Sequence, residues 1–225
     1  MSTAATGVMR LNPDDPDQVD AIAQLHTELL PWSIPARLGH HFMTRFYFTN
    51  LAASDLISCD LYAHEGKYVG FNVFTKYPGS FMREGIRRHF FTLCRISARI
   101  FASVPRRLAA LLGMVQKDAW LRADQSVRAG YWLTFGVLES YRRMKIDERG
   151  MRVSTALVQA MLDYFREEGF NRVDGGVERN NKSAIFFYHA CGFTIRDPGS
   201  GDDLRIHYDL AQDRSEIESS TRGNQ

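Results

Sequence analysis

Apolar and polar residues alternate along this 225-residue chain with two different periods. Apolar residues recur every three to four positions, which is typical of amphipathic helices, in the segments 17–30, 36–51, 84–104, 106–117, 153–168 and 183–190. Runs rich in β-branched and aromatic residues, which favour strands, lie at 8–11, 56–63, 68–75, 131–138, 172–177 and 204–210. The pattern therefore predicts helices and strands that are interleaved along the chain.

The order of these elements indicates the class of fold. The strands 56–63 and 68–75 flank Gly66-Lys67 and should form an antiparallel hairpin, whereas the strand-helix-strand order near the end requires a parallel crossover. Together they predict an α/β domain whose central sheet is mixed and is flanked by helices. We expect residues 1–212 to form this single domain and residues 213–225 to form a polar tail.

The charge is spread unevenly over the chain. Its 28 Lys+Arg and 26 Asp+Glu give a formal charge of only +2, which argues against a general nucleic-acid binder. The segment 76–129 nevertheless carries eleven basic and three acidic residues, a local charge of +8 that leaves the rest at −6. Because its basic and apolar residues alternate at helical spacing, we expect a basic amphipathic helical insertion.

Three interpretations of this insertion stay open. It could be a lid over a substrate cleft, an interfacial helix that draws residues 83–117 to anionic membranes, or an element of a homodimer. The continuous stripe of Phe, Leu and Ile between its charges argues against a nucleic-acid arm.

Other features exclude further classes of protein. The three cysteines (Cys59, Cys94 and Cys191) and the histidines have no metal-ligand spacing, so we predict no metal site. The N-terminus shows no apolar leader, and no apolar run approaches the ~20 residues that a membrane-spanning helix needs. These observations favour a cytoplasmic protein, in contact with a membrane at most peripherally.

One motif suggests a function. In the segment Asn181-Lys-Ser-Ala-Ile-Phe-Phe-Tyr188-His-Ala-Cys-Gly-Phe193 the spacing resembles the Asn-x-x-Ala-x-x-Phe/Leu-Tyr-x-x-x-Gly-Phe signature of the GCN5-related N-acetyltransferase (GNAT) superfamily. The element order over residues 8–210 is similar to that family as well. The stretch LHTELLPWSIPARLGHHFMTRFY resembles a subgroup that carries a basic helical insertion before the fourth strand.

The resemblance implies the acyl-CoA N-acyltransferase fold, with a splayed sheet of about six to seven strands. It further implies that acetyl-CoA, as co-substrate, lies between the parted strands 131–138 and 172–177. The acceptor would be the primary amine of a small molecule, with an amino sugar or sugar nucleotide as first guess. No nucleic-acid partner is implied.

The resemblance also assigns roles to single residues. Tyr188 lies two helical turns after Asn181 and would protonate the departing CoA thiolate, since a phenol has a pKa of about 10. Asn181 would bond the pantetheine arm or cap the following helix. Val137 and Leu138 would offer backbone N–H groups to the co-substrate and to the oxyanion of the tetrahedral intermediate.

The family's pyrophosphate loop precedes the helix 153–168. A helix N-terminus offers free amides and a positive dipole end to phosphate. The residues implied are Arg149, Gly150, Met151, Arg152, Val153, Ser154 and Thr155. Arg152 stands where the family has a glycine, and this replacement is tolerable only if residue 152 has a negative φ. Two alternatives stay open: the loop could be residues 142–147 instead, or it could have lost the ability to bind the co-substrate.

The residue that accepts the amine's proton is not fixed by the motif. Glu139, at the end of a strand, is the first choice, with Glu178, His26 or an ordered water as alternatives. The sequence thus predicts an N-acetyltransferase that works by direct attack in a ternary complex. Transfer of a longer acyl chain and non-catalytic acyl-CoA sensing are the alternatives.

Overall fold

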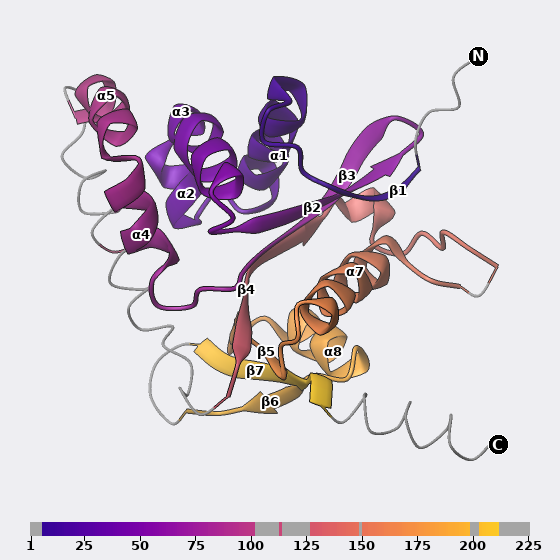
Figure 1. Cartoon of the computed structure of the whole chain (residues 1–225). Helices are drawn as coiled ribbons and strands as arrows, with labels where there is room; N and C mark the ends of the chain where they lie inside the picture. The colour runs from indigo at the N-terminus through magenta and orange to yellow at the C-terminus, as the bar shows by residue number, and fades with distance from the viewer. Residues whose placement is uncertain (1–5, 102–112, 114–126, 149, 199–202, 212–225) are drawn as a thin grey trace.

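The computed structural model of the protein describes residues 6–101, 113, 127–148, 150–198 and 203–211, and of residues 97–101 the backbone alone. A single mixed sheet of seven strands, in the order β1-β2-β3-β4-β5-β7-β6, separates two groups of helices (Figure 1). The strands are β1 (Gly7–Arg10), β2 (Ser58–His64), β3 (Lys67–Thr75), β4 (Ala129–Val137), β5 (Arg172–Glu178), β6 (Thr194–Arg196) and β7 (Asp203–Asp209). The α/β class and the mixed sheet are therefore confirmed.

The helices fall near their predicted places, but the predicted helices 36–51 and 84–104 are both divided into shorter ones. They are α1 (Pro16–Leu29), α2 (Ile34–Leu38), α3 (His40–Phe42), the π-helix η1 (Met43–Leu51), α4 (Phe81–Arg88), α5 (Phe90–Phe101), the 3₁₀ turn η2 (Glu139–Tyr141), α7 (Val153–Glu167) and α8 (Lys182–Ala190). The helix predicted over 84–104 is two helices, because the chain bends at His89. The helix predicted over 106–117 and the tail 213–225 lie outside the described residues, apart from Gly113.

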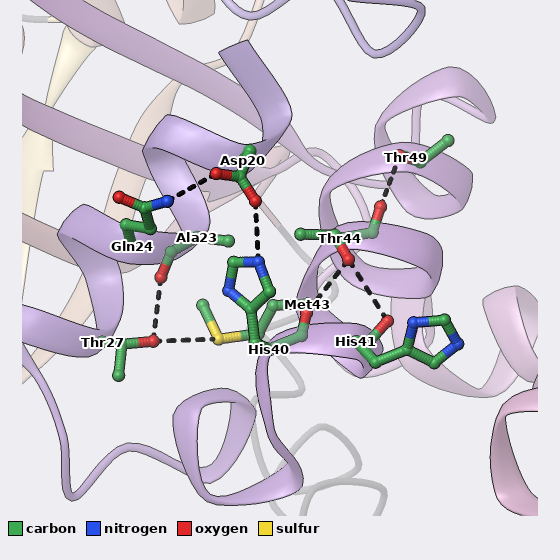
Figure 2. A network of polar contacts seen from close by, with 9 residues as sticks. All are labelled: Asp20, Ala23, Gln24, Thr27, His40, His41, Met43, Thr44 and Thr49. Carbon is green, nitrogen blue, oxygen red and sulfur yellow. Dashed lines mark hydrogen bonds and ion pairs between the residues drawn. The ribbon is translucent and has the colours of Figure 1, made fainter. Parts of the chain in front are cut away.

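The predicted helix 36–51 is divided into three pieces. Gly39, at φ 100°, ends α2 in a conformation that disfavours residues with a Cβ. The Thr49 hydroxyl then donates to the carbonyl of Thr44, five residues earlier, within the π-helix. Figure 2 shows how this segment joins α1: His40 Nε2 lies 2.7 Å from Asp20 Oδ1, while Thr27 contacts the sulfur of Met43.

Apolar packing holds a helical layer against each face of the sheet. On one face, α1, η1 and α4 cover β2 and β3, around fully buried rings such as Phe46 and Phe71. On the other face α7 packs across β2, β3 and β4, and α8 lies beside β6, around a core that includes Trp132, Phe165 and Phe193. Both faces of the sheet are thus packed against apolar cores. The one parallel pair of the described strands, β4–β5, lies in the interior of the strand order.

The parallel pair β4–β5 is short. It runs from Ala129↔Arg172 to Trp132↔Gly175, and the remaining residues of the two strands have no pairing with each other. Beyond Trp132, β4 pairs only with β3, with a bulge that leaves Leu133 unpaired, and β5 pairs only with β7. The expected splay of the sheet is confirmed, and the gap opens after four paired residues.

Candidate functional site

The gap between β4 and β5 exposes backbone groups that lack a sheet partner. The Leu138 N–H donates to the Val69 carbonyl of β3 at 2.9 Å. Since successive N–H groups of a strand point to opposite sides, those of Phe135 and Val137 point toward the gap. Val137 thus lies as expected for a donor, whereas the Leu138 N–H is already used in the sheet. The sequence reasoning missed Phe135, two residues before Val137 in the same alternation.

Tyr188 lies at the vertex of this gap. Its ring, on α8, is half-buried and packs edge-on against Trp132, the last β4 residue paired with β5, at 5.0 Å between ring centroids. Burial, with a smaller contribution from Cys191, raises the pKa of Tyr188 to about 12. The phenol therefore keeps its proton at neutral pH, and among the described residues its hydroxyl has no hydrogen-bond partner.

Asn181 caps the helix that carries Tyr188. Its Oδ1 accepts a hydrogen bond from the Ala184 N–H at 3.1 Å, at the N-cap position of α8. An N-cap oxygen satisfies one of the free amides at a helix start. Of the two roles expected for Asn181, the structure shows the cap, and the side-chain amide nitrogen stays without a partner within the described ranges.

The start of α7 carries three free amides. The first intrahelical bond runs from the Ala156 N–H to the Arg152 carbonyl. The N–H groups without such a bond are those of Val153, Ser154 and Thr155. Arg152 sits at the N-cap with φ −110°, so the side chain that replaces the family's glycine is tolerated without strain. This terminus can hold an anion.

The loop before α7 differs in detail from the expectation. Gly150 has φ +80°, a conformation that favours glycine, but the Met151 N–H donates to Asp147 Oδ1 at 2.7 Å and is already engaged. The six residues 143–148 fold back as a short antiparallel turn, bridged between Lys145 and Arg152. Arg149 lies outside the described residues. The helix begins at Val153, which agrees with the register 149–154 rather than 142–147.

The three candidate bases lie in different environments. Glu139, in η2, and Glu178, at the end of β5, are both exposed. His26 is fully buried on α1, where its ring stacks on Phe71 at 5.1 Å and its Nε2 lies 2.9 Å from Ser33 Oγ. Burial lowers the pKa of His26 to about 4. His26 is thus a neutral core residue, and the suggestion that it borders the acceptor site is not supported.

The opposite face of the gap, toward α1, is lined by a phenol and carboxylates. Leu29, at the end of α1, lies directly over Gly136 of β4, where an added Cβ would be 2.9 Å from its Cδ1. The Tyr131 hydroxyl lies over Gly176 of β5, 3.5 Å from where a Cβ would be. Burial, then the charges of Asp174 and Asp203, raise the pKa of Tyr131 against the opposing charge of Arg205. Asp174 is itself paired with Arg172 at 2.8 Å. Sequence patterns could not single out Tyr131, because its place depends on where the two strands part.

Within the described ranges, no group of three or more His, Cys, Asp or Glu side chains is placed to hold a metal ion. No described helix combines the length and apolar character needed to cross a bilayer.

The fold is that of the GNAT acyl-CoA N-acyltransferases. Residues 147–193, from the loop before α7 to the Gly-Phe after α8, match the model of the "Acetyltransferase (GNAT) family". No curated protein matches the sequence. The subgroup with a basic helical insertion stays a prediction.

Solved structures show the same fold over nearly the whole chain. SsHAT is 18% identical with a TM-score of 0.59, covering 91% of this chain and 99% of its own. Aminoglycoside 6'-acetyltransferase type Ii is 10% identical with a TM-score of 0.52, covering 90% and 96%. NAA60 of Arabidopsis thaliana, in complex with acetyl-CoA, is 17% identical with a TM-score of 0.50, covering 91% and 98%. At these identities the likeness shows the fold alone.

Proposed function

We propose that this protein is an N-acetyltransferase that moves the acetyl group of acetyl-CoA to a primary amine. The observation that carries the proposal is the parting of β4 and β5 after four paired residues, with the protonated phenol of Tyr188 at the vertex. The match of residues 147–193 to the GNAT family and the complex of NAA60 with acetyl-CoA support acetyl-CoA as the co-substrate.

The chain's own groups fit such a co-substrate at both ends. The free amides of residues 153–155 suit the pyrophosphate, because a helix N-terminus favours anions. The exposed Arg152 beside them can pair with a phosphate oxygen, and Arg149 is proposed on the resemblance alone. In the gap, the Phe135 N–H can take the place of a sheet hydrogen bond for a pantetheine amide, which leaves the Val137 N–H for the thioester carbonyl.

The chemistry needs one acid and one base. A neutral amine attacks the thioester carbonyl, the C–N bond forms, and the C–S bond breaks as the tetrahedral intermediate collapses. Tyr188 gives its proton to the leaving thiolate, and Glu139 accepts the proton that the new ammonium centre loses. Glu178 and an ordered water are the alternatives to Glu139. Because the Leu138 N–H is engaged, we assign the oxyanion donor to the Val137 N–H.

The acceptor side of the gap is polar. Tyr131 lies there with Asp174, which is paired with Arg172 at 2.8 Å, and the charges of Asp203 and Arg205 also act on the phenol. Such groups can orient the hydroxyls of a polar acceptor, so an amino sugar or sugar nucleotide is the first acceptor to test.

The test separates the acid from binding. Tyr188→Phe should lower turnover by about two orders of magnitude or more, while the Kd for CoA changes by less than about threefold. Near-normal turnover in this variant would remove Tyr188 from the chemistry. Trp132 and Phe193 pack against the ring, which phenylalanine keeps, so the variant should fold.

Two alternative functions have their own outcomes. Purified protein that binds CoA but acetylates no member of an amine panel would be an acyl-CoA sensor. A kcat/KM that rises from acetyl-CoA to longer acyl donors would identify a longer-chain N-acyltransferase.

A further inference from the structure

The helices α4 and α5 present two very different faces. Their inner faces pack on η1 and its neighbours, through Phe81, Met82, Gly85, Leu93 and Ile96, all of which are buried. Gly85 allows this close approach, since a Cβ there would lie 2.2 Å from Leu51 Cδ2. The two helices are therefore seated firmly on the fold, and their outer face is fixed in place.

The outer face combines aromatic rings and arginines. Phe90 and Phe91 are 54% and 81% exposed, with ring centroids 5.9 Å apart. Soluble proteins seldom expose two adjacent large aromatic side chains without a partner for them. The exposed arginines around the pair are Arg83, Arg87, Arg88 and Arg95. We call these six residues the basic aromatic surface.

The acid on this stretch does not offset the arginines fully. Glu84 forms ion pairs with Arg87 at 2.6 Å and Arg88 at 2.8 Å, and the arginines' side chains remain 73% and 47% exposed. The surface keeps a net positive charge of +3 from four arginines and this one glutamate. This net charge can attract an anionic partner, and the guanidinium groups of Arg87 and Arg88 stay open to solvent although both are paired with Glu84.

We propose that the basic aromatic surface docks on an anionic lipid membrane. Phenylalanine rings on a helix face can enter the boundary between headgroups and acyl chains, while arginines bind the lipid phosphates. Charge complementarity favours this partner over a second copy of the same surface, because two such surfaces would place like charges against each other.

This surface is separate from the proposed acyl-CoA site. In Figure 1, α4 and α5 lie at the edge of the helical layer away from α7 and α8, which frame the gap. The docking proposal does not depend on the acetyltransferase activity.

The experiment is sedimentation of the full chain with vesicles. Vesicles of phosphatidylcholine with about 30% phosphatidylglycerol should bind the protein at least about tenfold more tightly than phosphatidylcholine alone, and 0.5 M salt should weaken binding strongly, since the Debye length falls to a few ångströms. Phe90→Ser with Phe91→Ser, and separately Arg87→Gln with Arg88→Gln and Arg95→Gln, should each weaken binding about tenfold or more.

Matched variants elsewhere provide the controls. Phe186→Ser removes an aromatic side chain that is 80% exposed on α8, and Lys67→Gln with Lys182→Gln removes two exposed charges. These variants should bind vesicles like the parent protein, and circular dichroism should show every variant folded.

Three results would overturn the proposal. One is equal binding to neutral and anionic vesicles, or none to either. Another is equal loss of binding in the control variants. The third is that the surface variants abolish self-association, seen by sedimentation equilibrium, or binding to a random RNA oligonucleotide, rather than binding to vesicles.

Discussion

The buried phenol of Tyr188 has a consequence for the pH dependence of turnover. Because burial disfavours the phenolate, the pKa lies near 12 and the proton is retained well above pH 10. We expect kcat for acetyl transfer to show no alkaline decline between pH 8 and about 10.5, whereas a phenol of ordinary pKa near 10 would be half ionised there. A half-maximal loss at or below pH 10, with the fold intact by circular dichroism, would contradict this.

The buried imidazole of His26 should make folding stability sensitive to mild acid. Its folded pKa of about 4 lies below the ordinary 6.5 of the unfolded chain. The group therefore contributes stability that is present above pH 6.5 and is lost as the pH falls toward 4. Between pH 7 and pH 5 this amounts to about 2 kcal/mol.

His26→Phe tests this contribution. The substitution keeps a ring against Phe71 but removes the titration and the contact with Ser33. Urea unfolding at pH 7 and pH 5 should show a free energy that falls by about 2 kcal/mol less in the variant than in the parent. An equal fall in both proteins would mean that His26 is hydrated or paired in solution.

Asn181 and Tyr188 were singled out by the resemblance to the GNAT signature, whose intervals the sequence contains. The structure places Asn181 at the N-cap of α8 and Tyr188 within that helix. Phe135 and Tyr131 gain their importance only from where β4 leaves β5, which no local pattern encodes. His26 was proposed as a base because the sequence of an amphipathic helix does not show whether a histidine faces the core or a cleft.

At the scale of one element, Asn181 at the N-terminus of α8 has two proposed roles: it caps the helix and it binds the pantetheine arm. The cap uses the carbonyl oxygen, whereas a bond to the pantetheine arm would use the amide nitrogen. Asn181→Asp keeps an oxygen for the Ala184 N–H and should change stability little, yet it should weaken CoA binding about tenfold, since it replaces a donor by a charge. Calorimetric titration with CoA measures this.

Asn181→Ala is the companion variant. It should lose about 1 kcal/mol of stability as well as affinity, since it removes both cap and donor. If the aspartate variant binds CoA like the parent, Asn181 is a cap alone.

Element boundaries were harder to predict than element types. The pattern over 36–51 is helical throughout, but Gly39 interrupts it and a π-helix follows, whose hydrogen-bond period an apolar pattern does not distinguish from that of an α-helix. Strand β6 has three residues, too few for an alternation to show. The bend at His89 likewise leaves no periodic signal, and it is held by a contact of its Nε2 with Ser54 Oγ.

At the scale of the whole molecule, the short β4–β5 pair divides the sheet into two parts, β1–β4 and β5–β7–β6. Only four residue pairs between β4 and β5 join these parts. A ligand in the gap would supply hydrogen bonds to both parts. Acetyl-CoA should therefore slow hydrogen exchange of the Phe135 and Val137 amides, while amides of the β2–β3 ladder that already bond each other change little. Equal protection in both places, or none, would argue against binding in the gap.

The alternation of elements was enough to predict a mixed α/β sheet. The splay itself came from the resemblance to GNAT proteins, since the residues of β4 past Trp132 are as strand-like as those before it. The basic insertion was recognised from its charge, but its two described helices show which side chains face outward, which a helical period alone does not establish.

The narrow seam between the two parts of the sheet would also matter in the cell. A protein whose unliganded form opens more readily is degraded faster when its ligand is scarce, because proteases act on opened chains. If the gap holds acetyl-CoA, the lifetime of this protein should shorten when acetyl-CoA becomes scarce, so that its abundance follows the concentration of its ligand without any dedicated regulator.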